Sequence, residues 1–241
     1  MTLKVSKSFK PSIASTTSIF LLIALFANLG LWQTKRAAEK SATEQLHQAA
    51  TPHVFEQALK EKKRFARIDV TGHYDPIRHI LLDNQIWNGR AGVHVYTPFN
   101  TLGGNTILVN RGWLPLAADR QSMPEINTPQ HQTVLSGMLN IVPVPGRILG
   151  RADRLDKDQW PQLVTYLNLE DIAGSLDAPL ENWVIQLSDA DQTGFEGRDW
   201  KPVFMSSRRH NAYAFQWFAL ATVSFVLWLL ISFRKSSENM K

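Results

Sequence analysis

Cysteine is absent from the 241-residue chain, and several kinds of site are excluded with it. Without thiolates the protein cannot build a Cys-ligated zinc site, a Cys-ligated iron–sulfur cluster or a cysteine nucleophile. The chain also lacks the Gly-x-Ser-x-Gly, His-Glu-x-x-His and Walker patterns of common hydrolases and nucleotidases. A disulfide-free domain is compatible with an oxidising compartment but does not require one. The sequence therefore shows no catalytic constellation.

Excess positive charge is missing from the central part of the chain. The two ends, residues 1–10 and 234–241, contain six Lys or Arg and one Glu, which accounts for the whole net charge of +5. Between them, twenty basic residues balance twenty acidic ones. A nucleic-acid-binding domain needs its positive excess on the folded surface. We therefore expect no nucleic-acid partner, and we assign the basic ends to contact with lipid headgroups of the bilayer.

Two long apolar stretches carry almost no charge and lie near opposite ends of the chain, at 11–34 and 211–233. At about 1.5 Å of rise per residue, each is long enough as a helix to cross a hydrocarbon core of about 30 Å. Aromatic side chains that favour the membrane interface lie near their ends, at Trp32, Tyr213, Trp217 and Trp228. The pattern predicts two transmembrane helices that anchor one extramembrane domain, residues 35–210.

Each stretch has a competing interpretation. The first follows Lys4, Lys7 and Lys10, as a secretory signal would. Cleavage after Ala27 would place Leu25 where a small residue is required, so we favour an uncleaved helix. The second stretch could be the core helix of a soluble domain, but it is longer and more uniformly apolar than such helices usually are.

The orientation follows from the basic ends. Two helices place both termini on one face of the membrane, and basic tails favour the cytoplasmic face. Basic residues on the other side of the helices nearly equal the tails in number, but a long connecting segment is translocated largely regardless of its charge. We expect tails 1–10 and 234–241 in the cytoplasm, with the central domain on the outer side of the membrane.

Between the spans, the sequence predicts first helices and then strands. Residues 35–46 lack Gly and Pro, so the first helix should continue beyond the bilayer. Thr51 and Pro52 indicate an N-cap and first turn of a short helix reaching Lys62. Another short helix is expected over 169–176. Strands are expected over 64–71, 80–82, 93–99, 106–109, 133–142, 163–169 and 182–187.

Short strands separated by turn residues favour antiparallel pairing over a parallel sheet, which would need intervening helices. Residues 116–129 and 143–159 are expected to be loops. The fold class predicted is a membrane protein with two transmembrane α-helices and an α+β domain dominated by an antiparallel β-sheet or barrel.

Three segments together resemble the SURF1 family of oxidase assembly proteins. Residues 29–40, with Gly30, Trp32, Gln33, Arg36 and Lys40, are similar to the family's exit from the first helix. Residues 108–115, which read Leu-Val-Asn-Arg-Gly-Trp-Leu-Pro, are similar to its Val-Asn-Arg-Gly-Trp-Val-Pro turn. Residues 210–218 are similar to its His-x-x-Tyr-Ala-x-Gln-Trp-Phe motif, although residues 206–209 lack a Pro found in many members. Weaker matches lie at 72–75 and at Trp200-Lys201-Pro202.

The resemblance implies a non-catalytic, membrane-anchored factor for assembling haem-copper cytochrome c oxidase, with a proposed role in inserting haem a into the large catalytic subunit. It also implies a bacterial inner membrane, or a mitochondrial inner membrane in a eukaryote, with the central domain on the periplasmic or intermembrane-space side. Haem a synthase is a further partner that it suggests. His210, Tyr213 and Trp217 share a helical face, where imidazole could ligate haem iron beside apolar rings. Arg36 and Arg209 could pair with the propionates. The plain alternative is an interfacial histidine among ordinary aromatic residues of the membrane boundary.

Other residues are candidates for partner contact. We assign Trp32, Gln33, Arg111, Trp113 and Gln216 to partner binding. Two structural alternatives stay open: Trp113 packs inside the domain while Arg111 pairs with an acid such as Asp83, and Gln216 bonds to Asn28 across the helix pair. His73 and His79 are unfavourable as a metal site because Pro76 interrupts the segment between them.

Two other functional classes remain open. An interaction scaffold would bind oxidase subunits or the haem-synthesising enzyme without touching the cofactor. A membrane-tethered sensor or an unrecognised periplasmic enzyme has less support, because neither a catalytic constellation nor a cytoplasmic signalling domain is visible.

Overall fold

The computed structural model describes residues 7–9, 11–117, 119–120, 122–143, 155–200 and 205–235. The chain forms two compact units, one of residues 1–45 with 202–241 and one of residues 46–201. Most of both predicted tails lies outside the described residues, as do 144–154 of an expected loop and the Lys201-Pro202 part of a weak motif.

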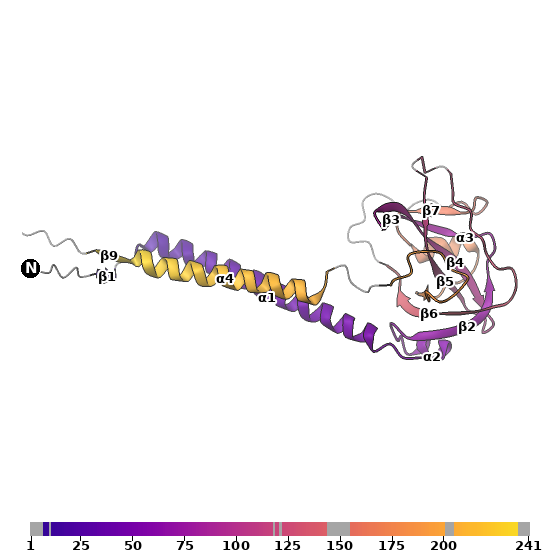
Figure 1. Ribbon diagram of the computed structural model, residues 1–241, viewed down its shortest axis with the longest axis horizontal. Coiled ribbons are helices and arrows are strands. Elements are labelled where there is room, and N and C mark those ends of the chain that lie inside the picture. Colours follow the sequence, from indigo (N-terminus) through magenta and orange to yellow (C-terminus); the bar gives the residue numbers. More distant parts are fainter. Residues whose placement is uncertain are drawn as a thin grey trace, which may run out of the picture. The chain divides into compact units, whose positions relative to one another are not determined.

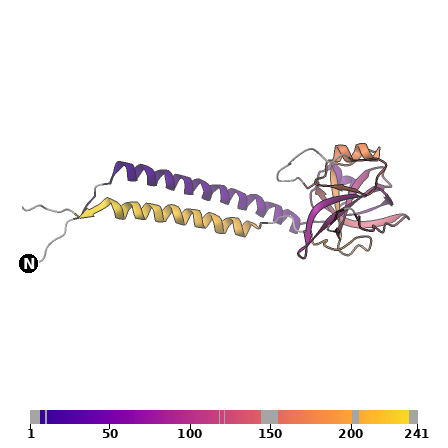
Figure 2. The ribbon, with the colours of Figure 1, turned by 90° about the horizontal axis from the view of Figure 1, so that it is seen from above.

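The first unit is an antiparallel pair of long helices, α1 (Ile13–Gln48) and α4 (Ser207–Ser232). They run side by side in both ribbon views (Figures 1 and 2). Short strands β1 (Lys7–Phe9) and β9 (Phe233–Lys235) pair with each other at the end of the helix pair. The predicted extension of the first helix is confirmed, because α1 continues without a break to Gln48.

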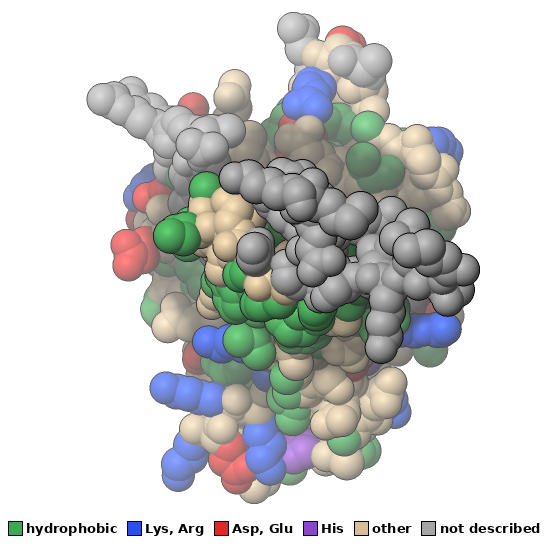
Figure 3. Space-filling view, turned by 90° about the vertical axis from the view of Figure 1, so that its left-hand side faces the viewer, with side chains coloured by type: hydrophobic (Ala, Val, Ile, Leu, Met, Phe, Trp, Pro, Cys, Tyr) green, Lys and Arg blue, Asp and Glu red, His purple; other side chains and the backbone are tan. Residues whose placement is uncertain are grey.

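Both helices are long and apolar enough to cross a membrane, with mean hydropathies of 1.8 and 2.0 in their most apolar windows. Only 6% and 11% of these windows is buried inside the protein. A core helix of a soluble domain would have most of its apolar residues buried. Leu21, Phe215 and Leu230 are 68%, 73% and 65% exposed. Such exposed apolar side chains are expected of helices surrounded by lipid. Hydrophobic side chains also gather near the centre of the view in Figure 3, beside the atoms drawn in grey.

The two helices approach each other closely where side chains are small. A Cβ added at Gly30 would lie 2.7 Å from the ring of Phe218, so a larger residue there would have to displace this ring. Trp217 stacks on Phe26 with ring centroids 5.7 Å apart. The alternative hydrogen bond between Asn28 and Gln216 is not formed: Asn28 Nδ2 donates to Ala24 O of its own helix at 2.7 Å, because that carbonyl lies one turn away.

The second unit is a β-domain with two short helices. Its strands are β2 (Arg67–Tyr74), β3 (Ile80–Trp87), β4 (Arg90–Thr101), β5 (Thr106–Pro115), β6 (Thr133–Ile141), β7 (Gln162–Val164) and β8 (Trp183–Leu187). Its helices are α2 (Phe55–Lys60) and α3 (Leu169–Leu176). Helix α3 has the predicted bounds, and Asn168 caps it by accepting hydrogen bonds from the Glu170 and Asp171 N–H groups.

The sheet order is β2-β6-β8-β5-β4-β3-β7, and an added pairing of β2 with β4 closes the first five strands into a barrel. Strand β4 pairs with two strands along the same edge: its first half pairs with β3, and its last residues pair with β2. At the crossing, any side chain on Gly72 would overlap the backbone of Asn100, so glycine permits the closure. The predicted α+β architecture dominated by antiparallel strands is confirmed.

Two strand pairs are parallel, β3 with β7 and β5 with β8. Each joins strands far apart in sequence, where a long connection allows the chain to return in the same direction. The barrel interior holds one core cluster that includes Phe99, Leu135 and Ile185. A second cluster includes Ile172 and Leu176 of α3 with residues of β3, β7 and β8, and a third includes Leu81 of β3. Figure 1 labels these elements.

Most of the predicted strand ends are misplaced by a few residues, and the strand expected over 163–169 is confined to β7. Two of the wrong predictions have a clear physical reason. Thr51 and Pro52 do not begin α2, which starts at Phe55 after Val54. The segment pairs with Arg67 instead. Arg67 N donates to Thr51 O at 3.0 Å, and His53 N donates to Arg67 O at 2.8 Å. The strand expected to end at Val109 runs on to Pro115. A left-handed φ of 111° at Gly112 lets the bulged strand continue, and Trp113 N donates to Glu196 O at 2.6 Å.

Candidate functional site at the helix pair

His210 lies in the first turns of α4, and its side chain is turned toward α1. The residue is 9% exposed. Its Nδ1 lies 2.8 Å from Oε1 of Gln33, which belongs to α1. An amide oxygen only accepts hydrogen bonds, so His210 donates from Nδ1 and its ring proton is held there. The lone pair of the neutral ring is then on Nε2, the form in which histidine binds metals.

A second polar contact links the same two helices near His210. Glu44 of α1 accepts hydrogen bonds from Ser207 of α4, at 3.2 Å from its backbone N and 2.8 Å from its Oγ. The N-cap residue Ser206 makes no side-chain capping bond, so the Glu44 carboxylate supplies a partner for a free N–H at this helix end. Because Ser207 and His210 are three residues apart on α4, the two contacts together fix the rotation of α4 against α1.

The predicted aromatic residues differ in their surroundings. Tyr213 is 45% exposed, one turn from His210. Trp217 is half-buried by its stacking against Phe26. Tyr213 therefore offers a free ring face beside the histidine, whereas one face of Trp217 is already covered by α1.

The predicted basic residues lie on the surface of this unit. Arg36 forms an ion pair with Glu39 one turn away on α1, at 3.0 Å, with both side chains about half exposed. Arg209 is exposed next to His210. Ion pairs at such exposed positions contribute less than about 1 kcal/mol, so Arg36 can exchange its partner for another carboxylate at small cost.

Of the residues assigned to partner contact, Trp32 and Gln216 are exposed on the helix pair, with Trp32 at 51%. Gln33 is engaged by His210 and is half-buried. Trp32 and Gln216 are thus available to another chain or to lipid, and Gln33 has a structural partner within the protein.

Arg111 and Trp113 are buried, at 1% and 0% exposure, and the assignment of these two side chains to a partner surface is therefore wrong. Trp113 packs against Trp87 and donates from Nε1 to Gln85 O at 3.0 Å. The structural alternative is correct for Trp113, but Arg111 does not pair with Asp83, which is bound by Arg120.

Arg111 is held without a carboxylate among the described residues. Its guanidinium donates to Thr193 O from Nε at 2.8 Å, to Asn127 O at 2.7 Å and to Thr128 Oγ1 at 2.7 Å. The rings of Tyr74 and Phe195 lie 4.9 and 4.7 Å from its central carbon. Burial lowers the pKa of Arg111 to about 10 and raises that of Tyr74 to about 12. The residue joins two loops to the barrel.

Two histidines of the β-domain are also held inside. The pKa of His79 is lowered to about 4, mainly by burial and further by the positive charge of Arg111. Burial also lowers the pKa of His94 to about 4. His79 Nδ1 lies 3.0 Å from Thr97 Oγ1. The described residues contain no group of three His, Asp or Glu side chains that could hold a metal ion.

Glu44 is the functional candidate that the sequence did not indicate. It lies in a helical run of mixed charges, where a carboxylate normally faces solvent. Its partner Ser207 is 163 residues away in the chain. The only local signal was that the predicted second helix lacked an acidic residue in its own first turn, which left its N-terminal N–H groups without a nearby carboxylate.

Comparison with known proteins agrees with this architecture. A sequence model of the SURF1 family matches residues 20–222. The chain is 24% identical over 221 residues to a SURF1-like protein of Rickettsia conorii, covering 88% of each chain. It is 24% identical over 231 residues to a SURF1-like protein of Rickettsia prowazekii, covering 91% of this chain and 90% of the relative. A SURF1-like protein of Rickettsia felis is 22% identical over 219 residues, which cover 88% of this chain and 94% of the relative. The family match includes the β-domain and the adjoining parts of both helices, and the protein belongs to the SURF1 family.

Proposed function

We propose that the protein is a membrane-anchored assembly factor for haem-copper cytochrome c oxidase, and that it holds haem a on His210 while assisting its insertion into the large catalytic subunit. Membership of the SURF1 family supports the role in oxidase assembly. The observation that supports the haem step is the hydrogen bond from His210 Nδ1 to Gln33 Oε1, because it leaves Nε2 with a lone pair for iron.

The residues around His210 suit a large apolar ring with acidic edges. Tyr213 offers a partly exposed ring, and the outer surface of the helix pair is apolar. Arg209 and Arg36 supply guanidinium groups that can pair with carboxylates such as propionates. Gln33 orients the imidazole, and Glu44 holds α4 in the rotation that brings His210 to Gln33. When bound, the haem would supply an iron that accepts one imidazole ligand.

The protein would act as a carrier and not as an enzyme. A single histidine ligand without a second protein ligand gives moderate affinity, and a site that must pass its cargo to another protein has to release it. The partners in this step would be the large catalytic subunit of the oxidase and, for loading, haem a synthase.

The membrane placement in this proposal is a two-span arrangement in a bacterial inner membrane, or in a mitochondrial inner membrane in a eukaryote. Both spans are retained, the two ends of the chain lie in the cytoplasm or matrix, and the β-domain lies on the opposite side. The continuous α1, packed along α4 through Gly30 and Phe26, supports retention of the first span, because cleavage would remove the partner of α4.

The test is absorbance spectroscopy of the full chain purified in detergent from cells that make haem a. The wild-type protein should carry a haem a spectrum, and His210→Ala should lose most of it. Gln33→Leu removes the acceptor that fixes the tautomer, so it should weaken haem binding about 10-fold while leaving the ligand in place. His73→Ala, which changes an exposed histidine of β2, is the matched control. Normal haem retention in His210→Ala would refute the ligand assignment.

A scaffold function is the second candidate, and the half-exposed Trp32 favours it. Tryptophan is enriched at the centres of protein interfaces, and Trp32 lies outside the contact between α1 and α4. The scaffold proposal expects oxidase subunits to co-purify with the protein from cells lacking haem a. Trp32→Ala should then reduce the recovery of these subunits. In cells that make haem a, the same variant should keep the haem spectrum of the wild-type protein.

A further inference from the structure

The wall of the β-barrel is open along one edge of β2. Residues 67–72 of β2 pair with β6 on one edge, but β4 reaches the other edge only at residues 72–74. Segment 51–53 covers the start of that edge by pairing with Arg67. Leu102, in the turn between β4 and β5, donates to Thr71 O at 3.0 Å. Asp69 lies between these two covered positions.

The backbone of Asp69 faces this open edge. Alternate residues of a strand direct their N–H and C=O groups to opposite edges. Arg67 and Thr71 form these backbone hydrogen bonds on the edge away from β6. Asp69 lies midway between them, so its N–H and C=O groups are directed to the same edge. Within the described part of the chain, no backbone hydrogen bond reaches Asp69 from segment 51–53 or from the turn at Leu102. Asp69 therefore presents a donor and an acceptor ready for strand pairing.

A depression of about 560 Å³ lies over this edge. It is lined by residues 52–54, by the start of α2, by residues 69–71 of β2 and by residues 101–103 after β4. Val54 and Leu102 in its lining are 64% and 63% exposed, which gives two apolar contact points.

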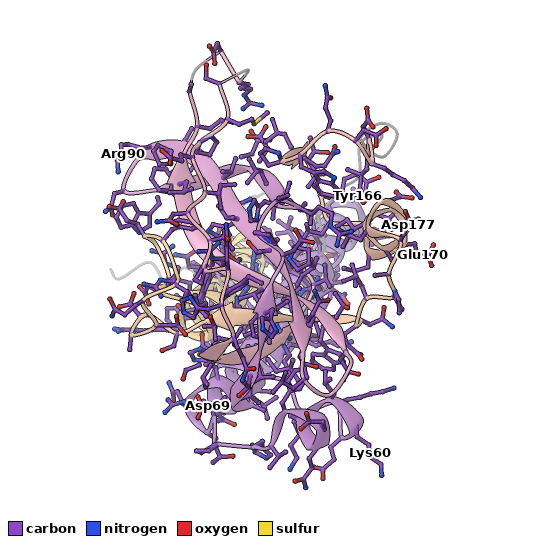
Figure 4. The ribbon with its side chains drawn as sticks, turned by 90° about the vertical axis from the view of Figure 1, so that its right-hand side faces the viewer. Lys60, Asp69, Arg90, Tyr166, Glu170 and Asp177 are labelled. Carbon is purple, nitrogen blue, oxygen red and sulfur yellow. The ribbon has the colours of Figure 1, made fainter. Side chains whose placement is uncertain are left out.

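The charged side chains in the lining of the depression are acidic. Among its described lining residues, Glu56 and Asp69 contribute carboxylates, His53 is the one histidine, and there is no Lys or Arg. Both carboxylates are exposed, and that of Asp69 also accepts a hydrogen bond from Ser136 Oγ of β6. Figure 4 shows Asp69 at the outer margin of the domain, well separated from Glu170 of α3. The depression thus combines an unpaired strand edge, two apolar points and two negative charges.

We propose that this edge binds an extended, basic peptide segment of a partner protein as an added strand. One residue of the segment exchanges backbone hydrogen bonds with Asp69, its basic side chain lies between Glu56 and Asp69, and apolar neighbours contact Val54 and Leu102. The edge from Arg67 to Thr71 spans about 13 Å at about 3.3 Å per residue. Since Arg67 and Thr71 are already covered at the two ends, one residue of the segment pairs directly, opposite Asp69.

The test measures peptide binding to the full chain in lipid nanodiscs by fluorescence anisotropy. The probe is a labelled Leu-Val-Arg-Val-Leu peptide with blocked ends. One comparison peptide carries Glu in place of Arg, and another carries methyl groups on its two central amides. The Arg peptide should bind at least about 10-fold more tightly than either, since one comparison lacks the positive charge and the other lacks the donors for strand pairing.

Variants of the protein separate charge from backbone pairing. The double variant Glu56→Gln with Asp69→Asn should weaken the Arg peptide and remove its dependence on salt. Asp69→Pro deletes the outward N–H, which is not used in pairing with β6, and should abolish binding, with circular dichroism checking the fold. Glu170→Gln is the matched control and should change nothing.

Three results would overturn the proposal. Equal binding of the methylated peptide would show that no strand is added, and equal binding of the Glu peptide would show that charge does not select the partner. Dimerisation of the protein through this edge, with no displacement by the Arg peptide, would assign the edge to a second copy of the chain. The methylated peptide keeps the test valid even if Asp69→Pro does not fold.

Discussion

Replacing Arg111 by lysine tests whether its buried guanidinium is retained for its shape. Lysine keeps the charge but presents a compact ammonium in place of the planar fork. It cannot reach Thr193 O, Asn127 O and Thr128 Oγ1 at once, and it cannot lie flat between the rings of Tyr74 and Phe195. No carboxylate among the described residues forms an ion pair at this position, and Asp191 acts on its charge only through Coulombic attraction.

The magnitude follows from the cost of that charge. Holding a lysine neutral at pH 7 costs at most about 5 kcal/mol, since its pKa in the unfolded chain is about 10.4. Losing two or three hydrogen bonds that leave buried acceptors unpaired costs about 1–3 kcal/mol each. Arg111→Met loses the same bonds, but it removes a burial penalty of about 3 kcal/mol, which corresponds to the pKa of Arg111 falling from 12.5 to about 10. Since both variants lose the bonds, the charge separates them, and we expect Arg111→Lys to be less stable than Arg111→Met by up to about 5 kcal/mol.

Urea unfolding of the full chain in detergent, followed by tryptophan fluorescence, measures these differences. The lysine variant should gain stability between pH 7 and pH 10, because its unfolded state binds a proton there that its folded state does not. Arg120→Lys is the control: Arg120 is 52% exposed in its pair with Asp83, so the change should cost less than about 1 kcal/mol. A lysine variant as stable as wild type, or more stable than Arg111→Met, would refute the argument.

Two further predictions concern the β-domain. His79 and His94 have folded pKa values of about 4, so the unfolded chain binds protons between pH 6.5 and 4 that the folded chain does not. The free energy of unfolding should therefore fall as the pH drops through this window, by up to about 3 kcal/mol for each histidine. Urea titrations at pH 7 and 4.5 measure the fall, and a His79→Gln variant that keeps the full slope would contradict it. At Gly112, where φ is 111° and an added Cβ would lie 2.5 Å from Glu196 O, an alanine should lower the melting temperature clearly. Gly174→Ala in α3 is the control: the added Cβ has no neighbour within 4 Å, so it should stabilise the folded protein by about 0.5–1 kcal/mol. If the Gly112 variant melted at a higher temperature than the Gly174 variant, the steric explanation at Gly112 would be excluded.

Elements that depend on local interactions were predictable from the residues alone. The two spans follow from uninterrupted apolar runs, because any helix that exposes such a surface needs lipid or another covering. Helix α3 was located to the residue, since Asn168 and the run after it contain the capping and turn signals themselves. Strands were found but most ends were misplaced, because a strand continues as long as a neighbour pairs with it. Strand β5 extends to Pro115 because β4 lies alongside it.

The candidate site was only partly predictable. His210 could be identified as a residue at the boundary between charged and apolar sequence, and the family resemblance indicated its motif. Its partner Gln33 was chosen for a different role, and Glu44 was not chosen at all. The two contacts join residues 177 and 163 positions apart, so no local pattern contains them.

By its order of apolar and polar residues alone, the sequence determined that the chain has two lipid-facing helices and a β-rich segment between them. Tertiary structure alone decided which polar side chains are turned inward. Arg111 and Trp113 read as surface residues at a turn, yet the barrel buries both, because the bulge at Gly112 keeps them within a strand covered by the loops at Asn127 and Thr193. Burial depends on the chain segments that pack over a residue, and these lie far from it in the sequence.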